Sequence, residues 1–356
     1  YGGADVRAAI RQTASWIIRQ LDGGPRRDVP GLYFGLGGAA WFLAEAARAL
    51  GDPALLRRSS EVALACATDG PIPDVTHGTA GAGMALLHQW LVTREQRFLE
   101  RAADAAEHLL RTSRRTAAGR VWPVPGGLPS RFAGLTMYGF AHGSAGICSF
   151  LLAASGATGE RRFLEAAAEG LDELVAVVEI DGDAALWPAQ PTTPYPAWPL
   201  WCHGSSGIGT ALLRGHLATG DRRYRELAEL SGNAVERIRW NQGFSHCHGL
   251  AGSGQFLLDL ADTLGQPDYR ARALALTEVL WHRRVEDRGR TVFPDETNVR
   301  VSADWGLGLA GIAAFLLRLD RAGPRPLMLD ELVPEVVVGS QPTPIHDSLR
   351  QEVPNV

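Results

Sequence analysis

The stretch His142-Gly-Ser-Ala-Gly-Ile-Cys-Ser-Phe-Leu-Leu-Ala-Ala154 shows the pattern that decides the fold, a G-x-x-G motif that runs directly into an apolar segment. The motif occurs six times, and successive first glycines are 43, 65, 61, 45 and 59 residues apart. The six copies are residues 35–38, 78–81, 143–146, 204–207, 249–252 and 308–311. A pattern repeated across the whole chain indicates a fold built from repeated units.

Each motif opens a segment that is apolar almost all round, which is typical of a helix buried on every side. Between these segments lie stretches with apolar residues on one face only, such as Phe98, Ala102, Ala105 and Leu109. They predict six outer helices, over residues 6–21, 54–68, 95–113, 159–178, 222–238 and 268–284. Inner helices that alternate with outer ones predict an all-α fold, an α/α toroid: a double ring of about six to seven inner and outer helices.

The glycines suggest where a site would form. Small residues let the starts of the inner helices approach one another, and free N–H groups at these starts would point into a common space. Residues beside each first glycine would then converge at one mouth of the ring. Loops expected over 115–135 and 181–200 would form walls, with weak strand signals at 120–124 and 290–293. We expect one domain over residues 1–338 and a disordered tail over 339–356.

Composition limits the class of protein. Of 356 residues, 46% are hydrophobic and 21% charged, with a net charge of −4 and a pI near 6.2. This balance predicts a protein that binds neither nucleic acid nor membrane. Four cysteines are too few for a disulfide framework in a chain of this length, which favours the cytoplasm. The start at Tyr1, not at Met, suggests a domain cut from a longer chain.

Cysteine and histidine stand at the converging positions. Cys202 and Cys247 each lie two residues before a first glycine, and His248 follows Cys247. Two thiolates and an imidazole suit Zn²⁺ and leave a fourth position open, as in catalytic zinc sites. His203, which follows Cys202, competes with His248 as the third ligand. Cys66 and Cys148 lie away from this offset, and we expect them to be buried as small apolar side chains.

Other polar residues are expected at the same mouth. Asp74 lies four residues before Gly78 and His142 directly before Gly143, which makes both of them candidate acid or base groups. Weaker candidates for lining residues are His77, His203, Trp201 and Trp305, whereas His246 and His282 are expected at the surface or in loops.

The repeated H-G-x-x-G motifs, together with Trp201-Cys-His-Gly204 and Cys247-His-Gly249, resemble the lanthionine synthetase C-like cyclases over residues 31–332. The resemblance implies a toroid around zinc, with Cys202, Cys247 and His248 as ligands. It also implies that His142 is the acid/base histidine and that Asp74 is the family's aspartate. Cyclases of this kind add cysteine thiols of a dehydrated precursor peptide to dehydroalanine or dehydrobutyrine, which forms thioether rings.

The sequence departs from free-standing members of the family at two positions. Trp198 stands where they usually have Arg, and His203 stands where they often have Tyr, so His203 becomes a further catalytic candidate. Residues 74–81 and 326–332 look like cyclases fused behind lyase and kinase domains. The chain is thus similar to the cyclase domain of a class IV synthetase, whose lyase and kinase would lie on the same polypeptide.

Three other functions compete with ring closure. A related enzyme would add glutathione to dehydro residues with the same zinc. A glycosidase or epimerase of the (α/α)₆ type would need paired carboxylates, and only Asp74 lies immediately upstream of an early motif. A toroid that only binds peptide would hold no zinc.

Overall fold

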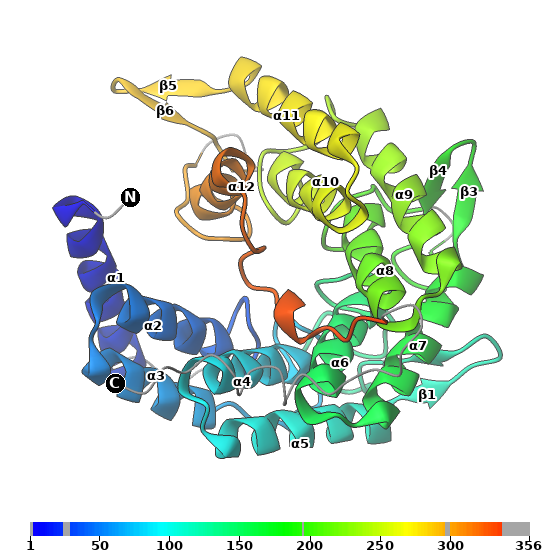
Figure 1. Ribbon diagram of the computed structural model, residues 1–356, viewed down its shortest axis with the longest axis horizontal. Helices are drawn as coiled ribbons and strands as arrows, with labels where there is room; N and C mark the ends of the chain where they lie inside the picture. Colours follow the sequence, from blue (N-terminus) through cyan, green and yellow to red (C-terminus); the bar gives the residue numbers. More distant parts are fainter. Residues whose placement is uncertain (1–2, 24–28, 194–195, 296–299, 337–356) are drawn as a thin grey trace. The chain divides into compact units, whose positions relative to one another are not determined.

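The chain is described by a computed structural model over residues 3–23, 29–193, 196–295 and 300–336. These residues form twelve α-helices, three two-stranded hairpins and one short 3-10 helix, which confirms the predicted all-α class. The chain divides into two compact units, residues 1–112 with helices α1–α5 and residues 113–356 with α6–α12 (Figure 1). The tail expected at 339–356 lies outside the described residues, and the prediction of one domain over 1–338 remains a prediction.

The outer helices lie where the one-sided apolar pattern predicted them. They are α1 (Ala4–Gly23), α3 (Pro53–Leu64), α5 (Gln96–Thr112), α7 (Arg161–Ala176), α9 (Arg222–Arg237) and α11 (Pro267–His282). In α5 the stripe through Phe98, Ala102 and Leu109 is fully buried, while most of the opposite face is polar and at least partly exposed. Burial of this stripe stabilises each outer helix, because isolated helices of this length are marginal in water.

The inner helices begin directly after the first glycine of each motif. They are α2 (Leu36–Leu50), α4 (Thr79–Thr93), α6 (Ser144–Thr158), α8 (Ser205–Thr219), α10 (Leu250–Leu264) and α12 (Leu309–Arg321). Nearly every residue of α4, α6 and α8 is buried, as the apolar pattern predicted.

The glycines are required by the chain that leads into each inner helix. A Cβ on Gly207 would lie 1.9 Å from the carbonyl oxygen of Trp201, and a Cβ on Gly252 would lie 1.9 Å from that of His246. Both carbonyls are six residues upstream, so the turn folds back over the first turn of its own helix. No side chain fits at such a distance, and this is why the motif repeats glycine.

This arrangement corrects the expectation that the first N–H groups of the inner helices are free. The N–H of Ser144 donates to the carbonyl of Met137 (3.0 Å), and the N–H of Leu250 donates to that of Gly243 (2.9 Å). The turns therefore satisfy the donors that a helix start leaves unpaired. The groups that each motif can offer to a site are therefore the side chains of its turn, just before the first glycine.

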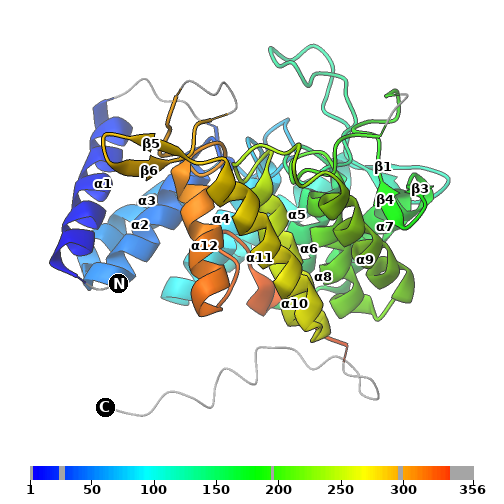
Figure 2. The same cartoon turned by 90° about the horizontal axis from the view of Figure 1, so that it is seen from above.

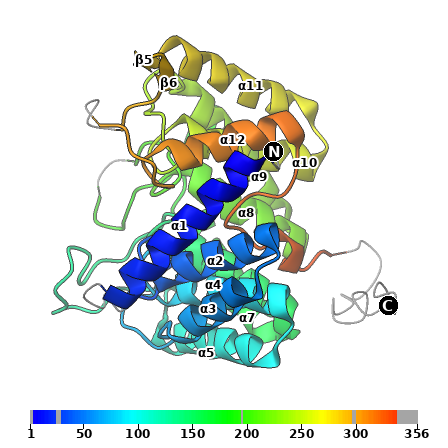
Figure 3. The same cartoon turned by 90° about the vertical axis from the view of Figure 1, so that its left-hand side faces the viewer.

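Each unit alternates inner and outer helices. In the first unit, α2 packs against α1, α3 and α4, and α1 crosses α2 obliquely (Figure 3). In the second unit, the inner helices α6, α8, α10 and α12 are neighbours in that order, with α7, α9 and α11 packed outside them. Figure 2 shows that the long loop 122–138 and the segments 187–193 and 196–200 extend on the same side of these helices.

The strands form three antiparallel hairpins. They are β1 (Arg114–Arg115) with β2 (Arg120–Val121), β3 (Glu179–Asp181) with β4 (Ala184–Leu186), and β5 (Val285–Asp287) with β6 (Arg290–Val292). The strand signals at 120–124 and 290–293 thus correspond to β2 and β6. The hairpin of β3 and β4 was not predicted, and most of it falls in a segment expected to be a loop.

A buried ion cluster joins the inner helices of the second unit to the segment 322–336. Asp259, which is 3% exposed, accepts from Arg214 (3.0 Å), Arg318 (2.6 Å) and Arg325 (2.6 Å). Arg214 also pairs with Asp330 at 2.6 Å. Burial alone would raise the pKa of Asp259, but the three guanidinium charges outweigh it and lower this pKa. The carboxylate is therefore held ionised at the point where α8, α10 and α12 meet.

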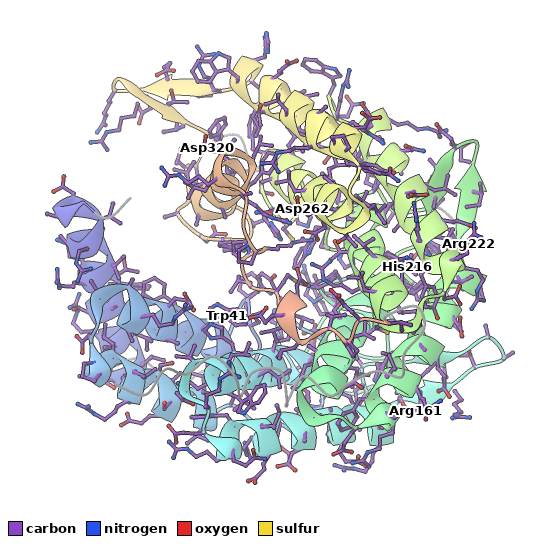
Figure 4. The ribbon with its side chains drawn as sticks, in the orientation of Figure 1. Trp41, Arg161, His216, Arg222, Asp262 and Asp320 are labelled. Atoms are coloured by element: carbon purple, nitrogen blue, oxygen red, sulfur yellow. The ribbon has the colours of Figure 1, made fainter. Side chains whose placement is uncertain are left out.

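We expect Asp259→Asn to lower the free energy of unfolding by about 3–5 kcal/mol, because it leaves buried guanidinium groups uncompensated. Denaturant unfolding followed by circular dichroism measures the change. Asp262→Asn is the matched control: Asp262 pairs with the same Arg318, but its side chain is 46% exposed (labelled in Figure 4). Its loss should cost less than about 1 kcal/mol. Equal effects of the two substitutions would contradict a special role for the buried carboxylate.

Candidate metal centre

Backbone hydrogen bonds join the turns of the second unit side by side. The N–H of Ala141 donates to the carbonyl of Cys202 (3.1 Å), that of Cys202 to Cys247 (3.3 Å), and that of Cys247 to Gly306 (2.8 Å). A Cβ on Gly139 would lie 2.1 Å from the carbonyl oxygen of Cys202, so the first two turns are in close contact. This series brings the residues before successive first glycines together, as the repeat predicted for this part of the chain.

Cys202, Cys247 and His248 form one cluster. One ligand atom from each lies within 4.8 Å of the other two, and the Cys247 Sγ and His248 Nε2 atoms are 3.5 Å apart. A tetrahedral zinc with usual Zn–S and Zn–N bonds separates sulfur and nitrogen ligands by roughly 3.6 Å, so this edge fits the ion. The described residues place His248, and not His203, in the cluster.

In the absence of a cation, the cluster disfavours ionisation of Cys202. The pKa of Cys202 is raised by its hydrogen bond with Cys247 and by burial, since the neutral thiol is favoured next to a second sulfur. A divalent cation reverses this preference, because it binds the thiolate form. The donor set therefore has the chemistry of a soft cation site, with two sulfurs and one imidazole.

Two further histidines lie beside the cluster. The rings of His142 and His203 are 5.5 Å apart, and His142 is buried. Burial, followed by the charges of His142, His248 and Arg131, lowers the pKa of His203 to about 4. The His203 Nδ1 atom is buried and has no hydrogen-bond partner among the described residues. His203 is thus a neutral imidazole at pH 7, with one ring nitrogen available.

His246 lies in a loop, as one of its two predicted places, but it is not at the surface. It is 2% exposed, and its ring lies 4.8 Å from that of Trp201 and 5.7 Å from that of Trp305. Burial, together with the charge of Arg325, lowers its pKa to about 3. The surface alternative was wrong because the aromatic residues that cover His246 come from its two neighbouring turns. His282, by contrast, is exposed as expected.

Asp74 and His77 belong to the first unit. Asp74 is 1% exposed, and its Oδ1 accepts the backbone N–H of His77 at 2.6 Å. The ring of His77 stacks on Phe34, with ring centres 5.3 Å apart. The carboxylate thus fixes the turn that precedes α4. Since the two units are described separately, the expected role of Asp74 beside His142 remains a prediction.

The loop 122–138 adds two residues that the sequence did not single out. The ring of Phe132 lies 4.3 Å from that of His142, and Arg131 lies over the face of Phe132. The sequence predicted only a wall-forming loop here. A phenylalanine in a Gly/Pro-rich segment carries no periodic signal that would indicate its contact with His142.

The sequence profile described as "Lanthionine synthetase C-like protein" matches residues 3–331. The chain belongs to the lanthionine synthetase C-like family. Among solved structures, this family member is similar to nisin cyclase, with 15% identity, a TM-score of 0.66, and coverage of 91% of this chain and 86% of that one.

Two further solved structures share the fold. They are the unsaturated glucuronyl hydrolase of Bacillus sp. GL1 (16% identity, TM-score 0.52, 80% and 85% of the two chains) and the cellobiose 2-epimerase of Bacillus thermoamylovorans (10% identity, TM-score 0.56, 81% and 87%). The likenesses confirm the predicted fold class of this family member, the α/α toroid. Among its described residues, no helix combines the length and apolar character needed to cross a bilayer.

The two remaining cysteines lie apart from the cluster, and both are fully buried. Burial raises the pKa of Cys66 to about 12 and raises that of Cys148 as well. Only the thiolate reacts with alkylating reagents, so roughly one Cys66 thiol in 10⁴ would be reactive at pH 8.

We therefore expect iodoacetamide at pH 8 to leave Cys66 and Cys148 unmodified in the folded chain and to modify both in urea. Peptide mapping by mass spectrometry measures each site. Rapid modification of either cysteine without denaturant would contradict its burial.

Proposed function

We propose that the chain is a lanthipeptide cyclase. It adds cysteine thiols of a dehydrated precursor peptide to dehydroalanine or dehydrobutyrine residues of the same peptide and so forms lanthionine and methyllanthionine rings. The observation that carries this proposal is the cluster of Cys202, Cys247 and His248 next to the rings of His142 and His203, in a member of this family.

The cluster is the proposed zinc site, with Cys202, Cys247 and His248 as ligands. When bound there, zinc would stabilise the thiolate form of an incoming cysteine at its fourth position. Two protein thiols and one imidazole with a mutual spacing within 4.8 Å support this assignment.

His142 is the proposed general acid. Addition of sulfur to the β-carbon leaves an enolate, and an imidazolium can deliver the proton that the α-carbon requires. The contact with Phe132 and the backbone bond from Ala141 to Cys202 fix the ring next to the sulfur ligands.

His203 is proposed to orient the substrate. With its pKa lowered to about 4, it is a weak base at pH 7, which favours a hydrogen-bonding role over removal of the thiol proton. A bound cation would lower this pKa further. Asp74 is proposed to position His142, the general acid, as the family resemblance of its motif suggests.

We also propose that this cyclase works in the cytoplasm, behind lyase and kinase domains of one class IV polypeptide. The lyase and kinase would supply the dehydro residues by phosphorylating serine and threonine and eliminating phosphate. Four cysteines without a disulfide support a reducing compartment. The likeness of residues 74–81 and 326–332 to fused cyclases supports the domain order.

The competing activity is addition of glutathione to dehydro residues, which would use the same cluster. A peptide that carries one dehydroalanine and one cysteine, offered with and without glutathione, separates the two activities. Ring closure lowers the number of free thiols without a change in mass, whereas addition of glutathione raises the mass of the peptide.

Purified chain should contain about one zinc ion, and Cys202→Ala or Cys247→Ala should remove both zinc and ring closure while circular dichroism keeps its helical signal. The helices bury their own core, so the metal is not needed for folding. Elemental analysis and mass spectrometry measure the outcome, with Cys66→Ala as the matched control that keeps zinc. Metal-free protein that still closes rings would overturn the zinc proposal.

His142→Asn should keep zinc and slow ring closure by roughly 10²–10⁴-fold, the usual contribution of a general acid. The enolate would then revert by expelling sulfur before water protonates it. The rate of product formation and deuterium incorporation at the α-carbon measure this step. His282→Asn, at an exposed position, is the control. An unchanged rate with zinc intact would remove His142 from the mechanism.

A further inference from the structure

The loop 122–138 forms a closed flap on the second unit. The N–H of Val124 donates to the carbonyl of Leu135 (2.8 Å), and the N–H of Gly134 donates back to Val124 (3.0 Å). Gly134 has a positive φ of 78°, which favours glycine at this end of the flap. The two hydrogen bonds join the ends of the intervening segment, so its residues are held as a compact loop.

Phe132 anchors this flap to the candidate site. Its ring packs on His142 at 4.3 Å, with 31° between the ring planes, and His142 is in turn 5.5 Å from His203. The anchor fixes the neighbouring residue, Arg131, whose guanidinium carbon lies 4.7 Å from the centre of the Phe132 ring. A cation over a ring face is held there electrostatically.

Arg131 carries a charge that is not paired within the described part of the chain. The side chain is exposed, and no carboxylate among the described residues pairs with it. Its guanidinium lies over Phe132, whose ring packs on His142, and His142 in turn lies next to His203. The flap therefore holds a permanent cation beside the two histidines that flank the sulfur cluster, a place that favours negative charge on a substrate.

We propose that Arg131 is a catalytic residue that donates hydrogen bonds to the carbonyl oxygen of the dehydro residue. This inference rests on the proposed cyclase function. As sulfur forms its bond to the β-carbon, the electron pair of the C=C bond moves toward the carbonyl, and its oxygen gains a full negative charge. Protonation of the α-carbon then restores the carbonyl. The thiol and the double bond are consumed, one C–S and one C–H bond form, and nothing is oxidised or reduced.

Guanidinium suits this role for physical reasons. It stays protonated at any working pH and presents several donors in one plane to an oxygen acceptor. Removing one donor to a developing oxyanion usually costs roughly 10²–10³ in kcat. An arginine that only attracted acidic parts of the peptide would instead change KM. Separate measurement of kcat and KM therefore distinguishes the two roles.

The experiment compares Arg131→Met with Arg161→Met in the full chain. Arg161 is the matched control: its side chain is 85% exposed, and it lies on the outer helix α7, at the rim in Figure 4. The substrate is a synthetic peptide with one dehydroalanine and one cysteine, and zinc content is measured for every variant. We expect kcat of Arg131→Met to fall about 100-fold, with KM changed less than about threefold and zinc unchanged. Arg161→Met should match the wild type.

Three further measurements separate chemistry from structure. Arg131→Lys should keep part of the rate, and guanidinium ion at non-denaturing concentration should partly restore Arg131→Ala. Exchange of the α-proton of the ring product in D₂O passes through the same enolate and should fall by the same factor as ring closure. A structural defect of the flap would not be rescued by a free cation.

The outcomes are distinguishable. Wild-type chain with zinc that closes no ring overturns the proposed function and this inference with it. If the wild type is active, three results for Arg131→Met would overturn the role of Arg131 alone. These are an unchanged kcat, an effect confined to KM, and loss of zinc.

Discussion

The fold depends on one contact, the approach of a backbone carbonyl to a glycine Cα six residues later. At Gly207 and Gly252 this oxygen occupies the place of a Cβ, and the same turn accepts the first N–H groups of its helix. Any side chain at these positions would push the turn off its helix. Since the turns carry all of the sulfur and imidazole groups of the cluster, the chemistry of the site depends on these glycines.

Turn-to-turn hydrogen bonds convert the repeat into a site. Ala141, Cys202 and Cys247 each donate to the next turn along, so residues more than a hundred positions apart become neighbours through three backbone bonds. At the other end of the same helices, Asp259 and its arginines hold α8, α10 and α12 together. One end of these helices is thus held by backbone hydrogen bonds and the other by buried charge.

The features that depend on local sequence pattern could be predicted from the sequence. Apolar periodicity located the outer helices, and the offset of Cys202 and Cys247 from their glycines located the cluster, with His203 left as an alternative to His248. Contacts between distant segments were not predictable. His246 was misplaced because Trp201 and Trp305 bury it, Arg131 was missed because a loop has no period, and the Asp259 cluster lies hidden within apolar helices. Asp74 matches a family motif, and its role remains a prediction.

The fourth turn of the hydrogen-bonded series differs from the two before it. Gly306 stands at the offset that Cys202 and Cys247 occupy, and its carbonyl accepts the N–H of Cys247. A Cβ there would meet only the Asp304 Oδ1 at 3.7 Å, an ordinary contact, so the backbone would tolerate a side chain. The scaffold thus has room for a fourth ligand at a position where the sequence provides none. In the proposed zinc site this would leave one coordination position open, which a catalytic zinc needs and a structural zinc does not have.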